Sequence, residues 1–275
     1  MSTSDSASPF SQNASNLRMY GTGDVARQYA LTPDRLKPAE EAILQRLAES
    51  LRGRTLLDVG VGGGRTTPHL RALSQDYLGM DYSGGMVAAC REKFPGVEFR
   101  ECDARDMSAL GREKFDFILF SFNGLDSIDH AGRLQVLREV LALLKPGGRF
   151  LFSSHNRRLP VERPWHPRIY TWGMSPRLIL YNLKCALRNT VNFWRHRGAQ
   201  VHEEGYEILV DSQLDFRMKN YYIDPAGQVR QLEAQGFREV EIFDRHGQPR
   251  AADAPEVDAT GHVHYLARKP PLAAS

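Results

Sequence analysis

The chain has 275 residues, of which 41% are hydrophobic and 25% charged, a composition typical of a soluble globular protein and not of a disordered or fibrous one. No apolar run reaches the ~18 residues of a membrane span. The polar, Ser-rich N-terminus lacks the apolar stretch of a secretory signal, so we expect a cytoplasmic location. Three cysteines without CxxC spacing predict reduced thiols and no zinc site.

The net charge of +3 is unevenly distributed. Between residues 155 and 198, eight arginines and one lysine accompany a single acid, Glu162, which gives this segment a charge of +8 and leaves −5 for the rest. The basic charge therefore belongs to one part of the chain.

Helices and strands alternate along the first half of the chain. Apolar residues at helical spacing predict helices over 34–52, 65–73, 83–94 and 130–144. Short apolar runs predict strands over 54–60, 76–81, 96–103, 114–122 and 149–155. This alternation predicts right-handed βαβ units and a parallel sheet that is covered by helices on both faces.

The alternation returns near the C-terminus. A helix is predicted over 224–237, with Asp224 as its N-cap. Two strands, 238–244 and 262–268, follow it with no helix expected between them. They are predicted to form an antiparallel pair at the sheet edge.

Residues 156–223 interrupt this pattern and are predicted to form an insertion that covers the substrate. Residues 206–223 are predicted to form a hairpin. The pattern of residues 175–198 predicts a helix. At a rotation of ~100° per residue, its apolar and basic side chains fall on two different faces. The apolar face holds Ile179, Leu183, Ala186, Leu187, Thr190 and Trp194, and the basic face holds Arg177, Lys184, Arg188 and Arg195.

The predicted organisation is therefore one core with an insertion. Its parts are a disordered tail (1–18), a cofactor-binding core with N-terminal lid helices (19–155), the insertion (156–223), the last helix and edge hairpin (224–268) and a tail (269–275).

The segment LLDVGVGGGRTTPHL, residues 56–70, has four glycines in five positions: Gly60, Gly62, Gly63 and Gly64. A strand, a glycine loop and a helix start gather free backbone N–H groups, so the loop should bind a ligand with negative or polar groups. In a dinucleotide-binding GxGxxG motif, Arg65 would occupy the third glycine position. That departure weakens a dinucleotide assignment.

The D-V-G-x-G-x-G pattern resembles motif I of the class I S-adenosylmethionine-dependent methyltransferases. GMDYS, ECDARDM, KFDFILFSF and LKPGGRFLFS resemble the family's following motifs, in order. The resemblance covers roughly 35–155 and 224–268. It implies a doubly wound, mostly parallel seven-stranded α/β sheet with an antiparallel edge hairpin, and S-adenosylmethionine as cofactor. The residues it assigns to the cofactor are Asp58, Gly60, Gly62, Gly64, Asp81, Tyr82, Met86, Asp103, Ala104, Phe120 and Tyr29.

Three of these acids have alternative roles. Asp58 could hold loop N–H groups only, although we favour a part in the cofactor site. Asp81 could be an N-cap, but its place at the end of the second strand favours the ribose hydroxyls. Asp103, assigned to the adenine, could instead pair with Arg105, and Asp106 is its rival.

The acceptor should bind where the fourth and fifth strands end. His155, at the end of the fifth, is our candidate general base, and a histidine that only holds a loop is the alternative. Asp126 lies near it in sequence, but the spacing of acids does not indicate a metal site, and we predict none. Substrate contacts are assigned to Tyr20, Asn123, Arg157, Tyr221 and Tyr222, of which at most one of the last two should face the pocket.

The basic insertion leaves the acceptor class open. We rank a small acidic or polar metabolite, methylated on O or N, first and a solvated helix face second. A lipid-linked acceptor, reached through a membrane-binding helix at 176–197, comes third and nucleic acid last. An NAD(P)-binding oxidoreductase and a non-catalytic cofactor-binding protein are the alternatives of another class. The sequence does not indicate an oligomeric state.

Overall fold

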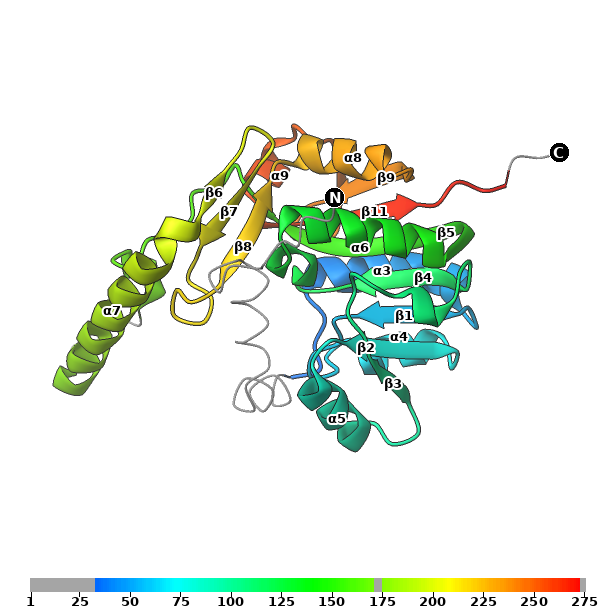
Figure 1. Cartoon of the computed structure of the whole chain (residues 1–275), viewed down its shortest axis with the longest axis horizontal. Coiled ribbons are helices and arrows are strands. Elements are labelled where there is room, and N and C mark those ends of the chain that lie inside the picture. The colour runs from blue at the N-terminus through cyan, green and yellow to red at the C-terminus, as the bar shows by residue number, and fades with distance from the viewer. Residues whose placement is uncertain (1–32, 171–174, 273–275) are drawn as a thin grey trace, which may run out of the picture.

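The computed structural model describes residues 33–170 and 175–272. Helices cover both faces of one sheet, and an extension carries the longest described helix away from it (Figure 1). The helices are α3 (Pro38–Leu51), α4 (Thr67–Leu73), α5 (Gly84–Lys93), α6 (His130–Leu143), α7 (Pro176–His196), α8 (Pro225–Ala234) and α9 (Pro255–Asp258). No described helix is both long and apolar enough to cross a membrane.

The strands form a single eleven-stranded sheet. They are β1 (Leu56–Val59), β2 (Tyr77–Asp81), β3 (Glu98–Glu101), β4 (Phe115–Phe120), β5 (Leu144–Asn156), β6 (Val201–His202), β7 (Tyr206–Val210), β8 (Lys219–Ile223), β9 (Arg238–Phe243), β10 (Pro249–Arg250) and β11 (His262–Arg268).

Seven strands make the predicted core sheet, in the order β3-β2-β1-β4-β5-β11-β9. The first five are parallel, and β11 is antiparallel to both β5 and β9. The predicted mostly parallel sheet with an antiparallel edge pair is confirmed. The segment between β9 and β11 was expected to hold no helix, but it forms β10 and the short α9.

Two apolar layers hold the helices to the sheet, because successive strand residues point to opposite faces. Leu56 packs on α3, α4 and α5, whereas Leu57 packs on the α6 and α8 side. In β5, Leu151 belongs to the first layer and Phe152 to the second. Because β1 to β5 are parallel, their carboxyl ends lie at one edge of the sheet. Doubly wound folds bind ligands at this edge.

The insertion is anchored by a strand that the sequence did not predict to join the main sheet. β7 and β8 form the predicted hairpin, and β8 also pairs in parallel with the end of β5, His155 opposite Tyr222. α7 lies beyond this hairpin, far from the core helices (Figure 1). The insertion thus extends the sheet beside the site instead of laying its helix over it.

Candidate active site

A pocket that is open to solvent lies at the carboxyl ends of β1, β2 and β4. The residues assigned to the cofactor from the sequence that line it are Gly60, Gly62, Asp81, Tyr82, Met86, Asp103, Ala104 and Phe120. Cys102, Arg105, Phe122 and Ile128 complete much of the remaining wall. Residues from the successive sequence motifs therefore line one pocket in the folded protein.

The glycine loop packs closely against the aromatic wall of the pocket. Gly60 has a φ of +64°, and a Cβ built there would lie 2.6 Å from the Phe120 ring, which lines the same wall. Gly62 has a φ of +55°, and its N–H donates to Asp81 at 3.0 Å. A side chain at Gly60 would both strain the backbone and displace the aromatic wall.

Gly60→Ala should therefore lose stability and affinity for S-adenosylhomocysteine together. Gly53→Ala is a matched control, since Gly53 has a φ of +67° and no atom within 4 Å of a built Cβ. Both variants should lose about 1 kcal/mol or more of unfolding free energy from backbone strain. In calorimetric titrations only Gly60→Ala should bind the nucleoside more weakly, and equal affinities in the two variants would refute this role for Gly60.

Asp81 ends β2 with its carboxylate in the pocket wall and is 6% exposed. One oxygen accepts from Gly62 N, and the other accepts from Ser83 N at 2.9 Å. Burial raises the pKa of this carboxyl, although both N–H groups oppose that shift. Two backbone donors thus fix the carboxylate between the glycine loop and the start of α5.

Asp103 both lines the pocket and forms the alternative ion pair weighed for it. The Arg105 guanidinium donates to both carboxylate oxygens, with Nε 3.0 Å from Oδ1 and 3.1 Å from Oδ2. Burial alone would raise the pKa of Asp103, but the hydrogen bonds from Arg105 outweigh it and hold the pKa low. The rival Asp106 lies outside the pocket wall and accepts from Ser108.

Two residues assigned to the cofactor lie behind the loop and not in the pocket wall. Asp58 is fully buried and accepts from the Thr66 hydroxyl at 2.5 Å and the Tyr77 hydroxyl at 3.1 Å. A Cβ built at Gly64 would point toward Phe94 and Cys90 and lie 2.4 Å from the Phe94 ring. Both residues therefore support the loop from the side away from the pocket wall, and their assignment to the cofactor stays a prediction.

The buried Asp58 makes stability depend on pH. Burial is the largest cause of its shift and raises its pKa from 3.8 to about 7, against the two hydroxyl donors. A raised pKa means that this carboxyl favours the folded state below its unfolded pKa, and that this contribution is lost as pH rises through about 7.

Asp58→Asn, which stays neutral, should therefore gain stability relative to the wild type by roughly 2 kcal/mol or more between about pH 5 and pH 8. The exposed Asp76, which accepts a hydrogen bond from the Thr55 hydroxyl at 2.6 Å, provides the matched Asp-to-Asn control. Urea unfolding at several pH values measures both differences. A wild-type-to-Asp58→Asn difference that stays constant over this range would contradict the shift.

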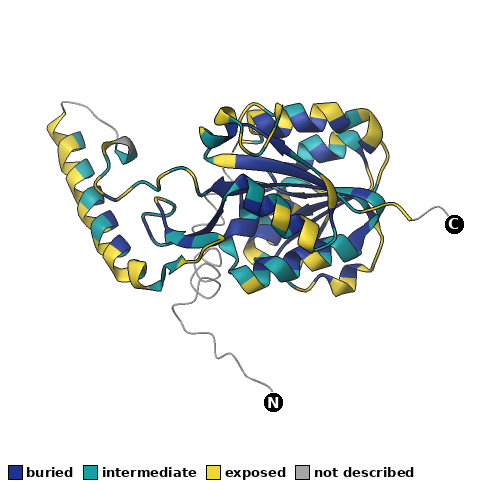
Figure 2. Cartoon of the chain, turned by 90° about the horizontal axis from the view of Figure 1, so that it is seen from above, coloured by how far each residue is buried: buried dark blue, intermediate teal, exposed yellow. Residues whose placement is uncertain are grey.

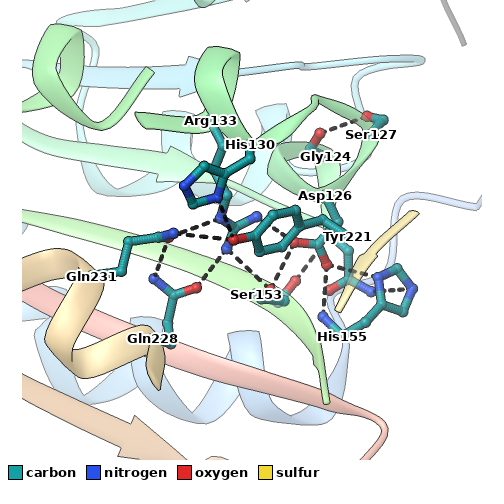
Figure 3. A network of polar contacts seen from close by, with 12 residues as sticks. Gly124, Asp126, Ser127, His130, Arg133, Ser153, His155, Tyr221, Gln228 and Gln231 are labelled. Atoms are coloured by element: carbon teal, nitrogen blue, oxygen red, sulfur yellow. Dashed lines mark hydrogen bonds and ion pairs between the residues drawn. The ribbon is translucent and has the colours of Figure 1, made fainter. Parts of the chain in front are cut away.

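A buried polar network lies beside the pocket, at the ends of β4 and β5 (Figure 3). Asp126 accepts from His155 Nδ1 at 2.7 Å and from the His155 backbone N at 2.6 Å. Its other oxygen accepts from Arg133 at 2.6 Å, and both Asp126 and Arg133 have no exposed surface. Burial would raise the pKa of Asp126, but Arg133 and His155 outweigh it and hold the carboxylate charged.

This arrangement fixes the tautomer of the neutral His155 ring. Because Asp126 only accepts, Nδ1 carries the proton, and in the neutral imidazole Nε2 then keeps a lone pair. Nε2 lies 3.2 Å from the Asn123 amide and 3.4 Å from the Gln213 amide. Asn123, in left-handed backbone conformation between two residues of the pocket wall, therefore links that wall to His155.

The structure places the other predicted substrate residues in different surroundings. Tyr222 packs its ring 4.8 Å from that of His155 and donates to Asp211 at 2.8 Å. Tyr221 points the opposite way, is fully buried and contacts His130 at 2.8 Å. Arg157 lies 3.3 Å from Glu207 and donates to the Glu204 carbonyl, so it links parts of the insertion. The assignment of both residues to the substrate stays a prediction.

Tyr20 and Tyr29 lie outside the described residues, as does the expected lid. No group of three or more His, Cys, Asp or Glu side chains within 33–170 and 175–272 is arranged to hold a metal. Asn156, which follows His155, donates to the Val257 and Thr260 carbonyls.

Sequence reasoning missed several functional neighbours. The sequence did not mark Arg133 as functional, because its position in α6 is typical of an exposed polar face. In the structure it is buried and donates to Gln228 and Ser154 in addition to Asp126. Glu40, buried in α3, pairs with Arg65 at 2.7 Å beside the pocket residue Ser121. A charged residue within an apolar helical face is the signal that could have marked Glu40.

Comparisons with known proteins indicate the class of enzyme. A family model described as a methyltransferase domain matches residues 56–148. The chain is 27% identical over 221 residues to a demethylmenaquinone methyltransferase of Beutenbergia cavernae, covering 79% of this chain and 81% of that protein. It is 30% identical over 134 residues to a ubiquinone biosynthesis O-methyltransferase of Bordetella avium, covering 47% of this chain and about half, 52%, of that relative.

Solved structures share the fold. The CcbJ methyltransferase from Streptomyces caelestis has a TM-score of 0.58 at 18% identity, covering 91% of this chain and 98% of that one. The 1,6-didemethyltoxoflavin-N1-methyltransferase from Burkholderia thailandensis has a TM-score of 0.56 at 16% identity, covering 98% and 93%.

Fold, pocket and family model together define a class I methyltransferase. The protein is an S-adenosylmethionine-dependent enzyme of that class.

Proposed function

We propose that this enzyme transfers the methyl group of S-adenosylmethionine to an oxygen of a small hydroxylated acceptor, with His155 as the general base. The observation that carries the proposal is the buried Asp126–His155 pair, joined at 2.7 Å beside the pocket. A hydroxyl acceptor needs a base to accept its proton, whereas an amine acceptor can react without one. Burying a carboxylate that orients an imidazole costs free energy. Such a pair is expected where the acceptor is a hydroxyl group that needs a general base.

The pocket residues fit the cofactor that the class uses. Gly60 lets the loop pack against the Phe120 ring, since a Cβ there would lie 2.6 Å from it, and both residues line the pocket at which we place the amino acid part. We assign the ribose hydroxyls to Asp81 and the adenine to Asp103 and Ala104, because these three follow the ends of β2 and β3 in the pocket wall. Bound there, S-adenosylmethionine supplies an electrophilic methyl group.

His155 then performs the proton transfer. The acceptor hydroxyl donates to His155 Nε2 in place of an amide hydrogen bond from Asn123 or Gln213. As the oxygen takes the methyl group, the sulfur–methyl bond breaks to leave S-adenosylhomocysteine, and the hydroxyl proton moves to Nε2. The imidazolium that results is stabilised by the Asp126 carboxylate at Nδ1, and Arg133 keeps that carboxylate ionised.

The surroundings of His155 favour an uncharged polar acceptor over an acidic one. Arg157 pairs with Glu207, and Arg158 pairs with Asp258 at 2.6 Å, so both arginines at the end of β5 are already matched by acids of the chain. Tyr222, Gln213 and His262 offer aromatic and neutral polar contacts around Nε2 instead. The relative named as a ubiquinone biosynthesis O-methyltransferase supports testing hydroxylated aromatic acceptors first.

The test is an acceptor panel in matched pairs. Purified enzyme and S-adenosylmethionine are incubated with catechols, hydroxybenzoates and hydroxyquinones, and with the corresponding aromatic amines, while S-adenosylhomocysteine formation is measured. The proposal expects turnover on hydroxyl compounds and little on their amines. Turnover confined to amines, with the same rate in His155→Ala, would overturn it.

A further inference from the structure

α7 projects from the body of the protein and contacts it along one side only. Its buried residues are Cys185, Asn189 and Phe193, and Phe193 packs on Val210 and Phe216 of the insertion. Figure 2 shows exposed residues along the outer side of this helix. A surface helix normally turns its apolar stripe toward the protein, and here the contact is narrow.

The apolar stripe of α7 faces outward instead. At ~100° per residue its large apolar side chains fall within an arc of about 120°, roughly opposite the buried side. They are Ile179, Leu180, Leu183, Leu187, Val191 and Trp194, each between 48% and 69% exposed. Exposed apolar surface of this kind marks an interaction site.

Basic side chains flank this arc. Arg177, Lys184 and Arg195 fall side by side on the helical wheel at its edge, and all three are exposed. Arg188 lies beside them, in an ion pair with Asp215 at 2.8 Å. The segment from Pro176 to His196 contains no Asp or Glu. Its outer surface is therefore apolar in the middle and cationic along one edge.

We propose that α7 binds the surface of an anionic phospholipid bilayer. The helix would lie in the interface with the apolar arc among the acyl chains and with Arg177, Lys184 and Arg195 at the phosphates. Nucleic acid would match the charge but leave six apolar side chains in water. A second copy of α7 would cover them but bring like charges together with no acid on either helix. The proposal does not depend on which acceptor is methylated.

Vesicle flotation with the full-length protein tests this. The probes are vesicles of phosphatidylcholine alone and of phosphatidylcholine with phosphatidylglycerol in equal parts. The wild type should float with the anionic vesicles and remain in solution with the neutral ones. Sedimentation equilibrium without lipid reports whether copies associate through α7.

Two pairs of variants separate charge from apolar contact. Replacing Arg177, Lys184 and Arg195 with Gln should reduce partitioning by on the order of 100-fold, whereas Gln at the exposed Arg52, Arg112 and Arg138 changes the net charge equally and should have little effect. Leu187→Ser should reduce partitioning roughly tenfold. Leu272→Ser, at a residue 77% exposed outside α7, is its control. A rise in Tm with S-adenosylhomocysteine shows that each variant is folded.

Three results would overturn the proposal. The first is absence of wild-type binding to anionic vesicles. The second is equal loss of binding in the α7 variants and their controls. The third is self-association that Leu187→Ser abolishes, combined with no lipid binding, which would assign the apolar arc to a second copy.

Discussion

Asp81→Ala should weaken binding of S-adenosylhomocysteine by roughly 1–3 kcal/mol, about 5- to 150-fold in Kd. The carboxylate lies in the pocket wall, held by the N–H groups of Gly62 and Ser83, and is assigned to both ribose hydroxyls. Removing the carboxylate deletes a charge-assisted hydrogen bond and leaves the ribose hydroxyls of the bound ligand without this acceptor. Calorimetric titration of the purified variant measures the loss.

The control for this experiment is Asp106→Ala, which removes an acid that lies outside the pocket wall. It should bind as the wild type does. Asp81→Asn keeps the shape and one acceptor oxygen and should fall between the wild type and Asp81→Ala. Wild-type affinity in Asp81→Ala would show that the ribose lies elsewhere and that the motif assignment is wrong.

His155→Ala should lower turnover by on the order of 10²- to 10⁴-fold, the usual contribution of a positioned general base. Affinity for S-adenosylhomocysteine should not change, because His155 is absent from the residues that line the cofactor pocket. His202→Ala is the matched control, since His202 also pairs with a carboxylate, Glu207 at 2.8 Å, but is 60% exposed on the insertion. Turnover is measured on the best acceptor of the panel.

Asp126→Asn tests the role of His155 as the general base by changing the carboxylate that accepts its hydrogen bond. It leaves Arg133 buried opposite a neutral amide, so the fold should lose stability, and activity alone would be ambiguous. The pH dependence of kcat/KM distinguishes the roles. If Asp126 positions the base, the acidic limb of the profile should move when it is replaced. An unmoved limb, together with full turnover in His155→Ala, would show that the proton is taken elsewhere.

The signals behind the predicted cofactor residues are local, and most of these residues line one pocket. The glycine run, the acid that ends β2 and the acid after β3 each follow a strand directly, and parallel strands bring their ends to one edge. Asp58 and Gly64 stay predicted cofactor residues that do not line the pocket, because a loop motif does not state which of its sides is turned to the ligand. Only the packing of Phe94 and Tyr77 beneath the loop decides that.

The acceptor side was harder to predict because it depends on contacts between distant segments. Strand alternation correctly separated Tyr221 from Tyr222, but only the pairing of β8 with β5 shows which of them meets His155. Helical periodicity found both faces of α7 without showing that the apolar one is exposed. Nothing in the local sequence of α6 indicated that Arg133 is wholly buried on Asp126.

The most direct test of the account is thermal unfolding of the wild type with S-adenosylhomocysteine, with NADH and without ligand, each beside Asp81→Ala. The account predicts a Tm that rises with S-adenosylhomocysteine concentration, as linkage requires of a ligand that binds the folded state, with a smaller rise in Asp81→Ala and none with NADH. A rise with NADH alone would contradict the cofactor assignment and, with it, the methyl-transfer chemistry built on His155.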